Sequence, residues 1–506
     1  MVRKSTFETA GGQVVLLSAF TLLVKALGFV KQAVIAARFG TSGATDVFFI
    51  ASDFFADLSA VFFSPLAIVF LTRYDIRMAE RGRDYANDNA ARILRDFSVA
   101  SAGLAVVFAA FPMPFARLLG FGFTLERQRQ LSQLLRMLSV GLVFYCTAAL
   151  LTALLQAQKR FLPAQGRGMV RSAAIIASVW LFSAPLGEGA LTVGMLSALM
   201  LEVAFLLTCA KTSVGPAKLC CCGKSGKADN GALIVAAAPL VLSYAAAEFS
   251  HIVDKAIASR LHEGAVSALC YAQVLQSFAV ALLVSNVGAV TFSHFSEKSA
   301  HSDNAGLLHA LCRAGELIVL VLMPVTIISI AASRSLVALV YARGRFDAAA
   351  LGETAQAFSG YAAGLLGLSL QTVFLRGLYA RGNTRLPLKI GLWSIALNIV
   401  LSLALSQIFG VGGIAFASTA SYILGAVLSS SVLNGSRMLS HPKAIGAAAI
   451  VCAATVALVA AYPIDLALLR CVALGMAGVV SYLLTLLAMR EPNALTFIRK
   501  IHRKTV

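Results

Sequence analysis

Residues 46–71 read DVFFIASDFFADLSAVFFSPLAIVFL, an apolar stretch that carries three aspartates. A helix needs about 20 predominantly apolar residues to cross the hydrocarbon core of a bilayer, so this stretch is long enough to span a membrane. Asp46, Asp53 and Asp57 are separated by seven and four positions, which places them on one face of a helix. Ionisable side chains inside a span usually face a protein interior or an aqueous path. The stretch therefore predicts a spanning helix with a polar stripe.

The composition extends this interpretation to the whole chain. Of 506 residues, 59% are hydrophobic and only 13% are charged, and the mean hydropathy is +0.82. Soluble domains are about 45–50% apolar and about 25% charged, so a soluble enzyme is excluded as the default class. The sequence also contains no P-loop, dinucleotide-binding fingerprint or nucleophile elbow. We therefore expect no enzymatic activity and no catalytic residues.

Stretches of spanning length recur about fourteen times along the chain. Lipid cannot hydrogen-bond to the backbone, so each stretch is predicted to be a helix, which satisfies its own backbone groups. The predicted fold is an all-α polytopic membrane protein, with spans at residues 13–36, 46–71, 97–119, 131–155, 169–185, 189–210, 232–252, 265–292, 311–332, 355–375, 388–408, 412–433, 444–462 and 467–488.

The basic residues are divided unequally between the two sides of the predicted membrane. The chain has 42 Lys and Arg against 23 Asp and Glu, a net charge of +19. With the N-terminus inside, 29 of these cations fall in cytoplasmic tails and loops, and 9 fall on the opposite side. Because cytoplasmic loops are enriched in Lys and Arg, both termini are predicted to be cytoplasmic. Topology and attraction to anionic membrane lipids account for the charge without a nucleic-acid partner.

Two pairs of similar short segments indicate an internal repeat. IAARF at 35–39 resembles IASRL at 257–261, and LQAQKRFLP at 155–163 resembles LYARGNTRLP at 378–387, at offsets of 222 to 224 residues. Six spans separate the copies, so both halves have one orientation, a parallel repeat typical of transporters. The predicted domains are an N-terminal six-helix lobe at 1–215, a C-terminal six-helix lobe at 228–435, two extra transmembrane helices at 440–490 and a basic cytoplasmic tail at 491–506.

Charged residues inside other spans extend the candidate site. Lys25 and Lys31 lie in the first span and Glu248 lies in the seventh. Counted from the loop between the first two spans, Lys25 lies at the depth of Asp57, and Lys31 lies near that of Asp53. Adjacent antiparallel helices could therefore pair these charges. Three interpretations stay open: a polar cavity between the lobes, structural ion pairs that hold helices together, or lysines that snorkel to the membrane interface.

The cysteines do not indicate a metal site or a disulfide framework. Their number, nine, is odd, and most lie within or beside predicted spans. Cys220, Cys221 and Cys222 are contiguous, whereas tetrahedral zinc sites place two to four residues between ligands. We therefore expect no bound metal.

The motifs beside the intramembrane charges resemble a known family. LGFVK at 27–31, AARFG at 36–40 and ATDVFF at 44–49 together resemble the N-terminal signature of the MurJ/MviN lipid II flippases of the MOP superfamily. VALVYARGRFD at 337–347 resembles the family's loop between spans 9 and 10, and LYARGNTRLP at 378–387 resembles the start of span 11. The likeness runs through most of the chain.

The resemblance implies a flippase of the bacterial inner membrane. Such a protein moves an undecaprenyl-pyrophosphate-linked glycan from the cytoplasmic to the outer leaflet by alternating access, and the peptidoglycan precursor lipid II is the expected cargo. The positions that match the family's headgroup site are Lys25, Lys31 and Asp46, while Asp53, Asp57 and Glu248 are further candidates for polar or ion-pair roles. Lysine binds phosphate as a point charge, without the fork of arginine.

Two departures from the family pattern keep other functions open. The family's basic pair in the second span falls near Ser59 and Ala60, and its basic element in the eighth span falls near Ala272, Gln273 and Val274. Fewer cations would suit a flippase for exopolysaccharide repeat units. The acidic stripe would suit a cation-coupled drug exporter. A lost cargo site would suit a non-transporting scaffold that recruits cell-wall or polysaccharide synthesis proteins.

The energy source is not encoded in a recognisable motif. We expect no cofactor, and transport driven by the membrane potential or a coupling ion. The potential is worth about 2.3 kcal/mol per charge per 100 mV.

Overall fold

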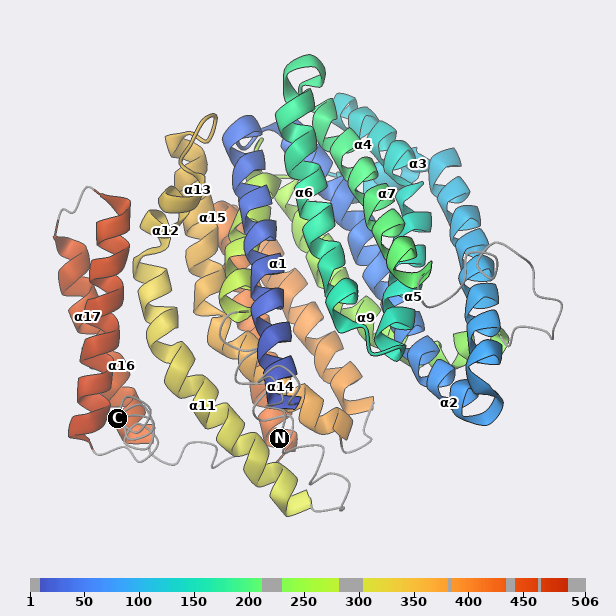
Figure 1. The fold of residues 1–506 in the computed structure, drawn as a ribbon. Coiled ribbons are helices and arrows are strands. Elements are labelled where there is room, and N and C mark those ends of the chain that lie inside the picture. Colours follow the sequence, from blue (N-terminus) through green and yellow to red (C-terminus); the bar gives the residue numbers. More distant parts are fainter. Residues whose placement is uncertain are drawn as a thin grey trace, which may run out of the picture. The chain divides into compact units, whose positions relative to one another are not determined.

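The protein is helical throughout the part of the chain that is described. The computed structural model describes residues 10–211, 230–281, 304–380, 385–433, 442–462 and 466–489, and no strand occurs within these ranges (Figure 1). Among these residues, nine helices are long and apolar enough to cross a membrane, or up to eleven if each of two bent pairs counts as one span. The predicted all-α polytopic fold is confirmed.

Contacts divide the chain into two compact units, Met1–Ser267 and Ala268–Val506. The helices of the first unit are α1 (Ala10–Phe39), α2 (Gly43–Ala110), α3 (Pro112–Leu119), α4 (Leu125–Leu138), α5 (Gly141–Ala157), α6 (Phe161–Leu186), α7 (Gly189–Lys211) and α9 (Asn230–Ala258). A shorter apolar helix, Ala265–Ala281, follows across the unit boundary. The second unit contains α11 (Asn304–Ala331), α12 (Ser333–Tyr341), α13 (Ala348–Ala363), α14 (Leu365–Ala380), α15 (Arg385–Val432), α16 (Pro442–Ala461) and α17 (Ala467–Ala488).

Within the described residues, the predicted spans fall on helical segments. Two of the helices, α2 and α15, each contain two predicted spans, separated by a break at Gly82 (φ 83°) and Gly410 (φ 56°), where the left-handed backbone conformation favours glycine. Two other spans consist of bent pairs, α4 with α5 at 44° and α13 with α14 at 42°. The predicted span at 265–292 is described as far as residue 281.

Side-chain hydrogen bonds define the start of α2 and its break. At its start, Ser42 and Thr45 form a capping box, in which each side chain accepts a backbone N–H of the other residue. Across the break, the buried Tyr74 hydroxyl donates to Asn87 Oδ1 at 2.7 Å. This bond joins the two parts of α2 on either side of Gly82.

The first unit packs around α2, which contacts α4, α5 and α9. A second group forms where α5, α6 and α7 meet, and its buried apolar residues are Ala148, Leu151, Leu155, Ala164, Val203, Leu206 and Ala210. The first helix, α1, packs on α6. The charged stripe of α2 is therefore held between helices of its own unit.

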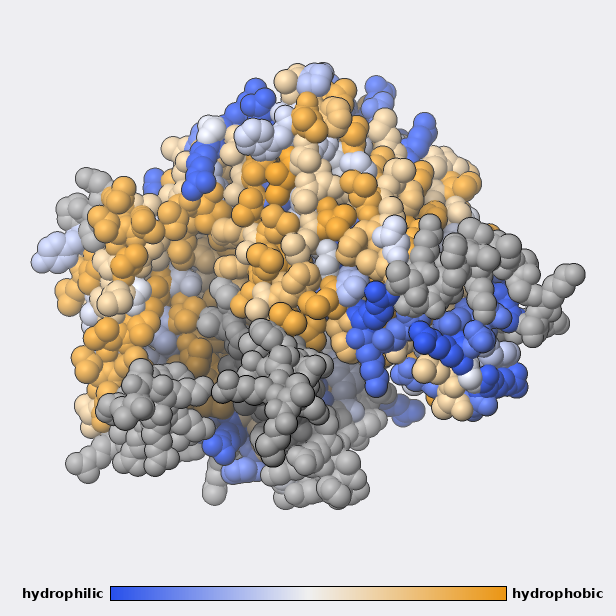
Figure 2. Space-filling view, viewed as in Figure 1, coloured by the Kyte–Doolittle hydropathy of each residue, from blue (hydrophilic) through white to orange (hydrophobic). Residues whose placement is uncertain are grey.

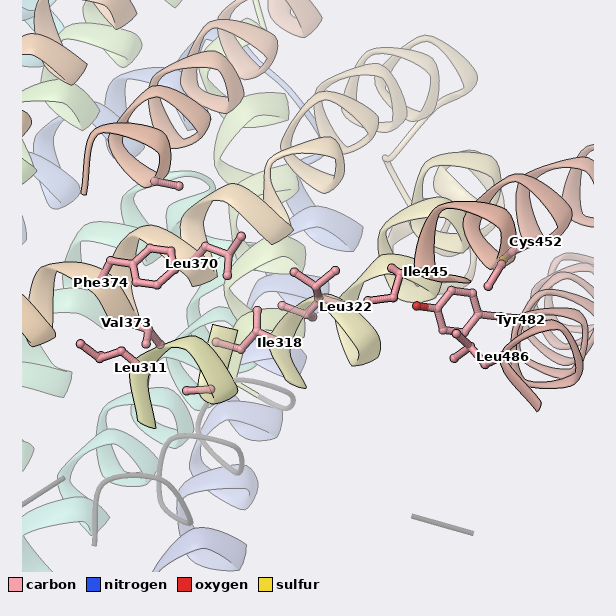
Figure 3. Packing of buried hydrophobic residues seen from close by; sticks show 14 of the residues in the cluster. Leu311, Ile318, Leu322, Leu370, Val373, Phe374, Ile445, Cys452, Tyr482 and Leu486 are labelled. Atoms are coloured by element: carbon pink, nitrogen blue, oxygen red, sulfur yellow. The ribbon is translucent and has the colours of Figure 1, made fainter. Parts of the chain in front are cut away.

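The second unit contains one apolar core that includes the two last helices. Ile318 and Leu322 of α11 lie between Phe374 of α14 and Tyr482 of α17, and Leu311 of α11 lies beside Val373 of α14 (Figure 3). The predicted domain boundaries at 215–228 and 435–440 were inferred from a sequence repeat, whereas the two compact units are defined by contacts within the structure. The predicted boundaries therefore stay a prediction. The predicted tail at 491–506 lies outside the described residues.

Apolar side chains cover much of the outer surface. Trp180 of α6 is 78% exposed and Ile450 of α16 is 72% exposed. Figure 2 shows hydrophobic side chains over α6, α7, α16 and α17, whereas hydrophilic ones gather around the break in α2. Large exposed apolar surface is typical of a lipid-facing protein. The protein is therefore a multi-pass membrane protein.

Candidate functional site

The acidic stripe of α2 faces a lysine on α9. Lys255 Nζ lies 2.9 Å from Asp53 Oδ2 and 3.6 Å from Asp57 Oδ2. The Lys255 side chain is only 9% exposed, whereas those of Asp53 and Asp57 are 34% and 16% exposed. Asp53 and Asp57 thus form ion pairs with Lys255, and their pairing with Lys25 or Lys31 stays a prediction. Lys255, three residues beyond the predicted span 232–252, neutralises part of the stripe.

The third acid of the stripe, Asp46, has a different set of partners. Its Oδ2 accepts the Gly264 backbone N–H at 2.7 Å, and its Oδ1 accepts both the N–H and the hydroxyl of Ser267, at 2.7 and 2.6 Å. These groups belong to the first turn of the helix Ala265–Ala281 and the residue before it. A carboxylate is stabilised at a helix N-terminus, where backbone N–H groups lack partners. Asp46 is fully buried, so its predicted headgroup contact stays a prediction, and its observed contacts cap a helix.

The first helix, α1, runs parallel to α6 in a nearly constant register. A Cβ atom at Gly28 would lie 3.9 Å from Ser172 Oγ, and Arg38 Nε donates to Ser183 Oγ at 2.9 Å. Residues on α1 thus lie beside residues on α6 that are 144 or 145 positions later. The two offsets differ by one position. A residue on α1 therefore lies at about the same height along the helix pair as the residue 144 or 145 positions later on α6.

The two lysines of α1 have different surroundings. Lys25 is exposed, whereas Lys31 is partly buried. Lys31 lies within electrostatic reach of Arg171 and Asp53. The structure therefore brings Lys31 close to the acidic stripe of α2, as the depth count predicts, although Asp53 forms its ion pair with Lys255.

The seventh predicted span contributes further polar groups through α9. Glu248 is partly buried and lies within electrostatic reach of Lys255 and Asp57. His251, one turn from Lys255, lies near the same lysine and Asp53. Glu248, predicted as a polar or ion-pair candidate, thus lies beside the aspartates of α2.

A second charged group, formed by α6 and α7, was not predicted. Arg171 Nε donates to Glu202 Oε2 at 2.6 Å, and Arg167 Nη1 lies 3.6 Å from Glu202 Oε1. Glu202 has no exposed surface, whereas the Arg167 and Arg171 side chains are 38% and 27% exposed. The Arg171 guanidinium also lies over the Tyr145 ring, 5.2 Å from its centre.

A signal for this group was present in the sequence. Glu202 is the single acidic residue of the predicted span 189–210, and a lone carboxylate there requires a partner. Arg167 and Arg171 are four positions apart, on one helical face. Hydropathy alone places both arginines at the start of the predicted span 169–185, whereas α6 already starts at Phe161.

The two charged groups of the first unit contain equal numbers of cations and carboxylates. The cationic members are Lys31, Arg167, Arg171 and Lys255, and the acidic members are Asp53, Asp57, Glu202 and Glu248. Each buried carboxylate lies near a cation, which the cost of burying an unpaired charge requires. The partly exposed members, above all Arg167 and Arg171, are placed to bind an anion.

Metal and disulfide chemistry receive no support from the described part of the chain. No group of three or more His, Cys, Asp or Glu side chains there could hold a metal ion. The described cysteines are free thiols. Cys220, Cys221 and Cys222 lie outside the described residues.

Comparisons with known proteins agree in the family they indicate. The family model described as "Lipid II flippase MurJ" matches residues 35–488. A "Probable lipid II flippase MurJ" of Rickettsia prowazekii is 25% identical, over 82% of this chain and 83% of the relative. A "Lipid II flippase MurJ" of Burkholderia cenocepacia is also 25% identical, over 82% of this chain and 81% of the relative.

Solved structures show the same fold. A lipid II flippase MurJ in an inward closed conformation superposes with a TM-score of 0.80 at 19% identity, covering 93% of this chain and 98% of that chain. An inward-facing multidrug resistance transporter of the MATE family superposes with a TM-score of 0.67 at 12% identity, covering 82% of this chain and 96% of that chain. The second match reflects the fold common to the MOP superfamily. Since the family model spans most of the sequence, this chain belongs to the lipid II flippase MurJ family.

Proposed function

We propose that this protein moves lipid II from the cytoplasmic to the outer leaflet of the bacterial inner membrane by alternating access. The observation that carries the proposal is the match of the MurJ family model to residues 35–488. The surplus of basic residues in one set of loops supports a topology with both termini in the cytoplasm.

The chemistry of the first unit suits a pyrophosphate headgroup. The exposed Lys25 offers an ammonium group for initial contact, and the partly buried Lys31 offers a second, six residues further along α1. A fixed cation attracts an anion more strongly where water is partly excluded, because the effective dielectric constant is lower. The two lysines, at successive positions along α1, would thus attract the anionic headgroup as it moves into the membrane.

The acidic stripe does not oppose this function, because it is partly neutralised. Lys255 pairs with both Asp53 and Asp57, so the two carboxylates do not present their full charge to an anionic cargo. The same pairing weakens the case for a cation-coupled drug exporter, which rests on the acidic stripe. A lipid-linked glycan is the cargo class that the remaining charges favour.

Transport by this route needs no nucleotide or metal. We propose that the membrane potential supplies the energy, since each charge that crosses is worth about 2.3 kcal/mol per 100 mV. The cargo is supplied by enzymes that assemble the lipid-linked glycan in the cytoplasmic leaflet and is consumed by enzymes that polymerise it outside. These cell-wall synthesis proteins are the proposed partners.

The proposal can be tested in a strain depleted of its own lipid II flippase. The gene for this protein is expressed there, and intact cells are treated with an enzyme that cleaves exposed lipid II and cannot enter the cytoplasm. The protein is expected to restore cleavage of lipid II and growth. A Lys25→Ala/Lys31→Ala variant is expected to restore neither.

Two controls make the outcome decisive. Membrane abundance of each variant is measured, and Arg83→Gln serves as a matched loss of one exposed cation on α2. If lipid II stays protected although the protein is abundant, lipid II is not the cargo, and export of exopolysaccharide repeat units is measured next. If the double lysine variant works fully, the headgroup assignment fails and the scaffold hypothesis gains.

A further inference from the structure

Arg167 and Arg171 of α6 lie at the same levels as the lysines of α1. A Cβ atom at Gly168 would contact the Val24 side chain, so Gly168 of α6 lies beside Val24 of α1. These two residues are 144 positions apart, as Gly28 and Ser172 are. At this register, Lys25 lies level with residue 169, midway between the two arginines. Lys31 lies about one turn further along and within electrostatic reach of Arg171. The four cations therefore form one series along the packed pair of α1 and α6.

Glu202 holds the arginines without using all of their donors. The Nε and Nη2 groups of Arg171 both lie 2.6 Å from Glu202 Oε2. Within the described residues, the Arg171 Nη1 group has no acceptor, and Arg167 reaches Glu202 only at 3.6 Å. A guanidinium has five N–H donors in a fixed fork, so each arginine can bind a further acceptor while one edge is held.

A buried hydroxyl beside Arg171 points to the same conclusion. Tyr145 is 6% exposed, and its hydroxyl has no hydrogen-bond partner among the described residues. The ring of this tyrosine lies against the Arg171 guanidinium. Buried polar groups in native structures are nearly always hydrogen-bonded, so an unpartnered hydroxyl next to partly exposed arginines indicates room for a ligand.

The net positive charge of the group formed by Arg167, Arg171 and Glu202 favours an anionic ligand. Arg167, Arg171 and Glu202 together carry one net positive charge, and Lys25 and Lys31 add two more. Arginine binds phosphate oxygens in a bidentate fashion, which the lysines of α1 cannot do. The positions near Ser59 and Ala60, where the family resemblance leads one to expect a basic pair, are uncharged. A pair of arginines on α6 would supply the missing donors from another helix.

We propose that Arg167 and Arg171 bind the pyrophosphate of the lipid-linked cargo together with Lys25 and Lys31, and that Glu202 positions the two arginines. The proposal rests on the function proposed above and adds two binding residues and a positioning residue to it. The two phosphates of one cargo headgroup are shared between the cations of α1 and those of α6.

Binding of undecaprenyl pyrophosphate to the purified full-length protein tests the proposal. Native mass spectrometry reads the bound fraction, with the uncharged undecaprenol as the comparison lipid. Arg167→Gln is the first variant, because this half-exposed side chain can be shortened without leaving a buried charge unpaired. The second is Arg171→Gln/Glu202→Gln, which removes both charges of the buried pair at once. Each is expected to weaken pyrophosphate binding about tenfold or more, the effect of losing a hydrogen bond to a charged group.

The controls separate this proposal from the function proposed above. Arg83→Gln should bind like the wild type, and Arg167→Lys should recover part of the loss caused by Arg167→Gln because it restores the charge. If Lys25→Ala weakens binding whereas both α6 variants bind within about twofold of the wild type, the α6 assignment is wrong and the flippase function stands. If the wild type shows no preference for the pyrophosphate over undecaprenol, both proposals are overturned.

Discussion

Nε and Nη2 of Arg171 both lie 2.6 Å from a single oxygen, Oε2, of Glu202, and Glu202 has no exposed surface. An ion pair in this position joins α6 to α7 inside the apolar group where α5, α6 and α7 meet. Arg167 Nη1 lies 3.6 Å from the other oxygen, so one buried carboxylate lies beside two arginines. The pair therefore links the packing of the first unit to its candidate anion site.

Breaking this pair on one side should destabilise the protein strongly. Arg171→Met leaves Glu202 buried with only the more distant Arg167, and loss of one partner of a buried ion pair costs about 3 kcal/mol or more. The expected result is a lower unfolding temperature in detergent, measured by loss of the monodisperse peak in size-exclusion chromatography after heating.

The double variant Arg171→Met/Glu202→Leu provides the control for this prediction. Replacing both charges by apolar groups of similar size is often nearly neutral, so most of the lost stability should return. If the single variant Arg171→Met were as stable as the wild type, the buried Glu202 carboxylate would not need the ion pair with Arg171.

Lys255 should be needed to keep the acidic stripe in place. Lys255→Met removes the cation that lies between Asp53 and Asp57 and is expected to cost about 1–2 kcal/mol. The cost should be smaller than at Glu202, because Asp53 is one-third exposed and solvent screens its charge. Thermal unfolding in detergent measures the difference, and Lys255→Arg should retain most of the stability.

Two further substitutions test whether the stability lost in Lys255→Met comes from repulsion between the aspartates. Adding Asp53→Asn and Asp57→Asn to Lys255→Met should restore part of the stability, since the repulsion between the two carboxylates is then removed. An additive loss in the triple variant would contradict the assigned ion pairs.

Asp46 should control the first turn of the helix Ala265–Ala281. Asp46→Ala removes the acceptor of the Gly264 and Ser267 backbone N–H groups, and leaving buried donors unsatisfied costs about 1–3 kcal/mol each. Hydrogen exchange at the Ser267 amide is therefore expected to become faster.

Asp46→Asn serves as the matched comparison, because its side-chain oxygen can still accept one of the two groups. Its exchange rate should fall between those of the wild type and Asp46→Ala. Unchanged exchange in Asp46→Ala would show that the helix start does not depend on this carboxylate.

Gly122 should not tolerate a side chain. A Cβ atom at this position would collide with the backbone of Arg260, and the Gly122 N–H donates to Ser259 Oγ at 3.3 Å. The loop between α3 and α4 thus lies directly against the end of α9. Gly122→Ala must shift two backbone segments apart and is expected to lower the unfolding temperature.

Gly103 offers a matched glycine with the opposite expectation. It lies inside α2, and a Cβ atom there would have no neighbour within 4 Å. Gly103→Ala should raise helix stability by about 0.5–1 kcal/mol, because alanine restricts the unfolded chain more than glycine does. If both alanine variants have the same unfolding temperature, the close approach at Gly122 is not a constraint.

Helical periodicity and hydropathy were sufficient to predict the helical segments and the polar stripe. In the described part of the chain, the predicted spans fall on helices, because an apolar segment in lipid has few other ways to satisfy its backbone. The spacing of Asp46, Asp53 and Asp57 also follows from the 3.6-residue turn alone. What the sequence could not supply was the joining of two spans into α2 around Gly82, which depends on local backbone conformation.

The sequence by itself therefore determined which residues are helical, which share a face, and which family the motifs resemble. Only the tertiary structure decided that Asp53 and Asp57 pair with Lys255 and that Glu202 holds Arg167 and Arg171. The physical reason is that a repeat of 3.6 residues fixes the direction of a side chain relative to its own helix. The neighbouring helix that this face meets is chosen by packing over the whole unit, and that choice decides which charges come together.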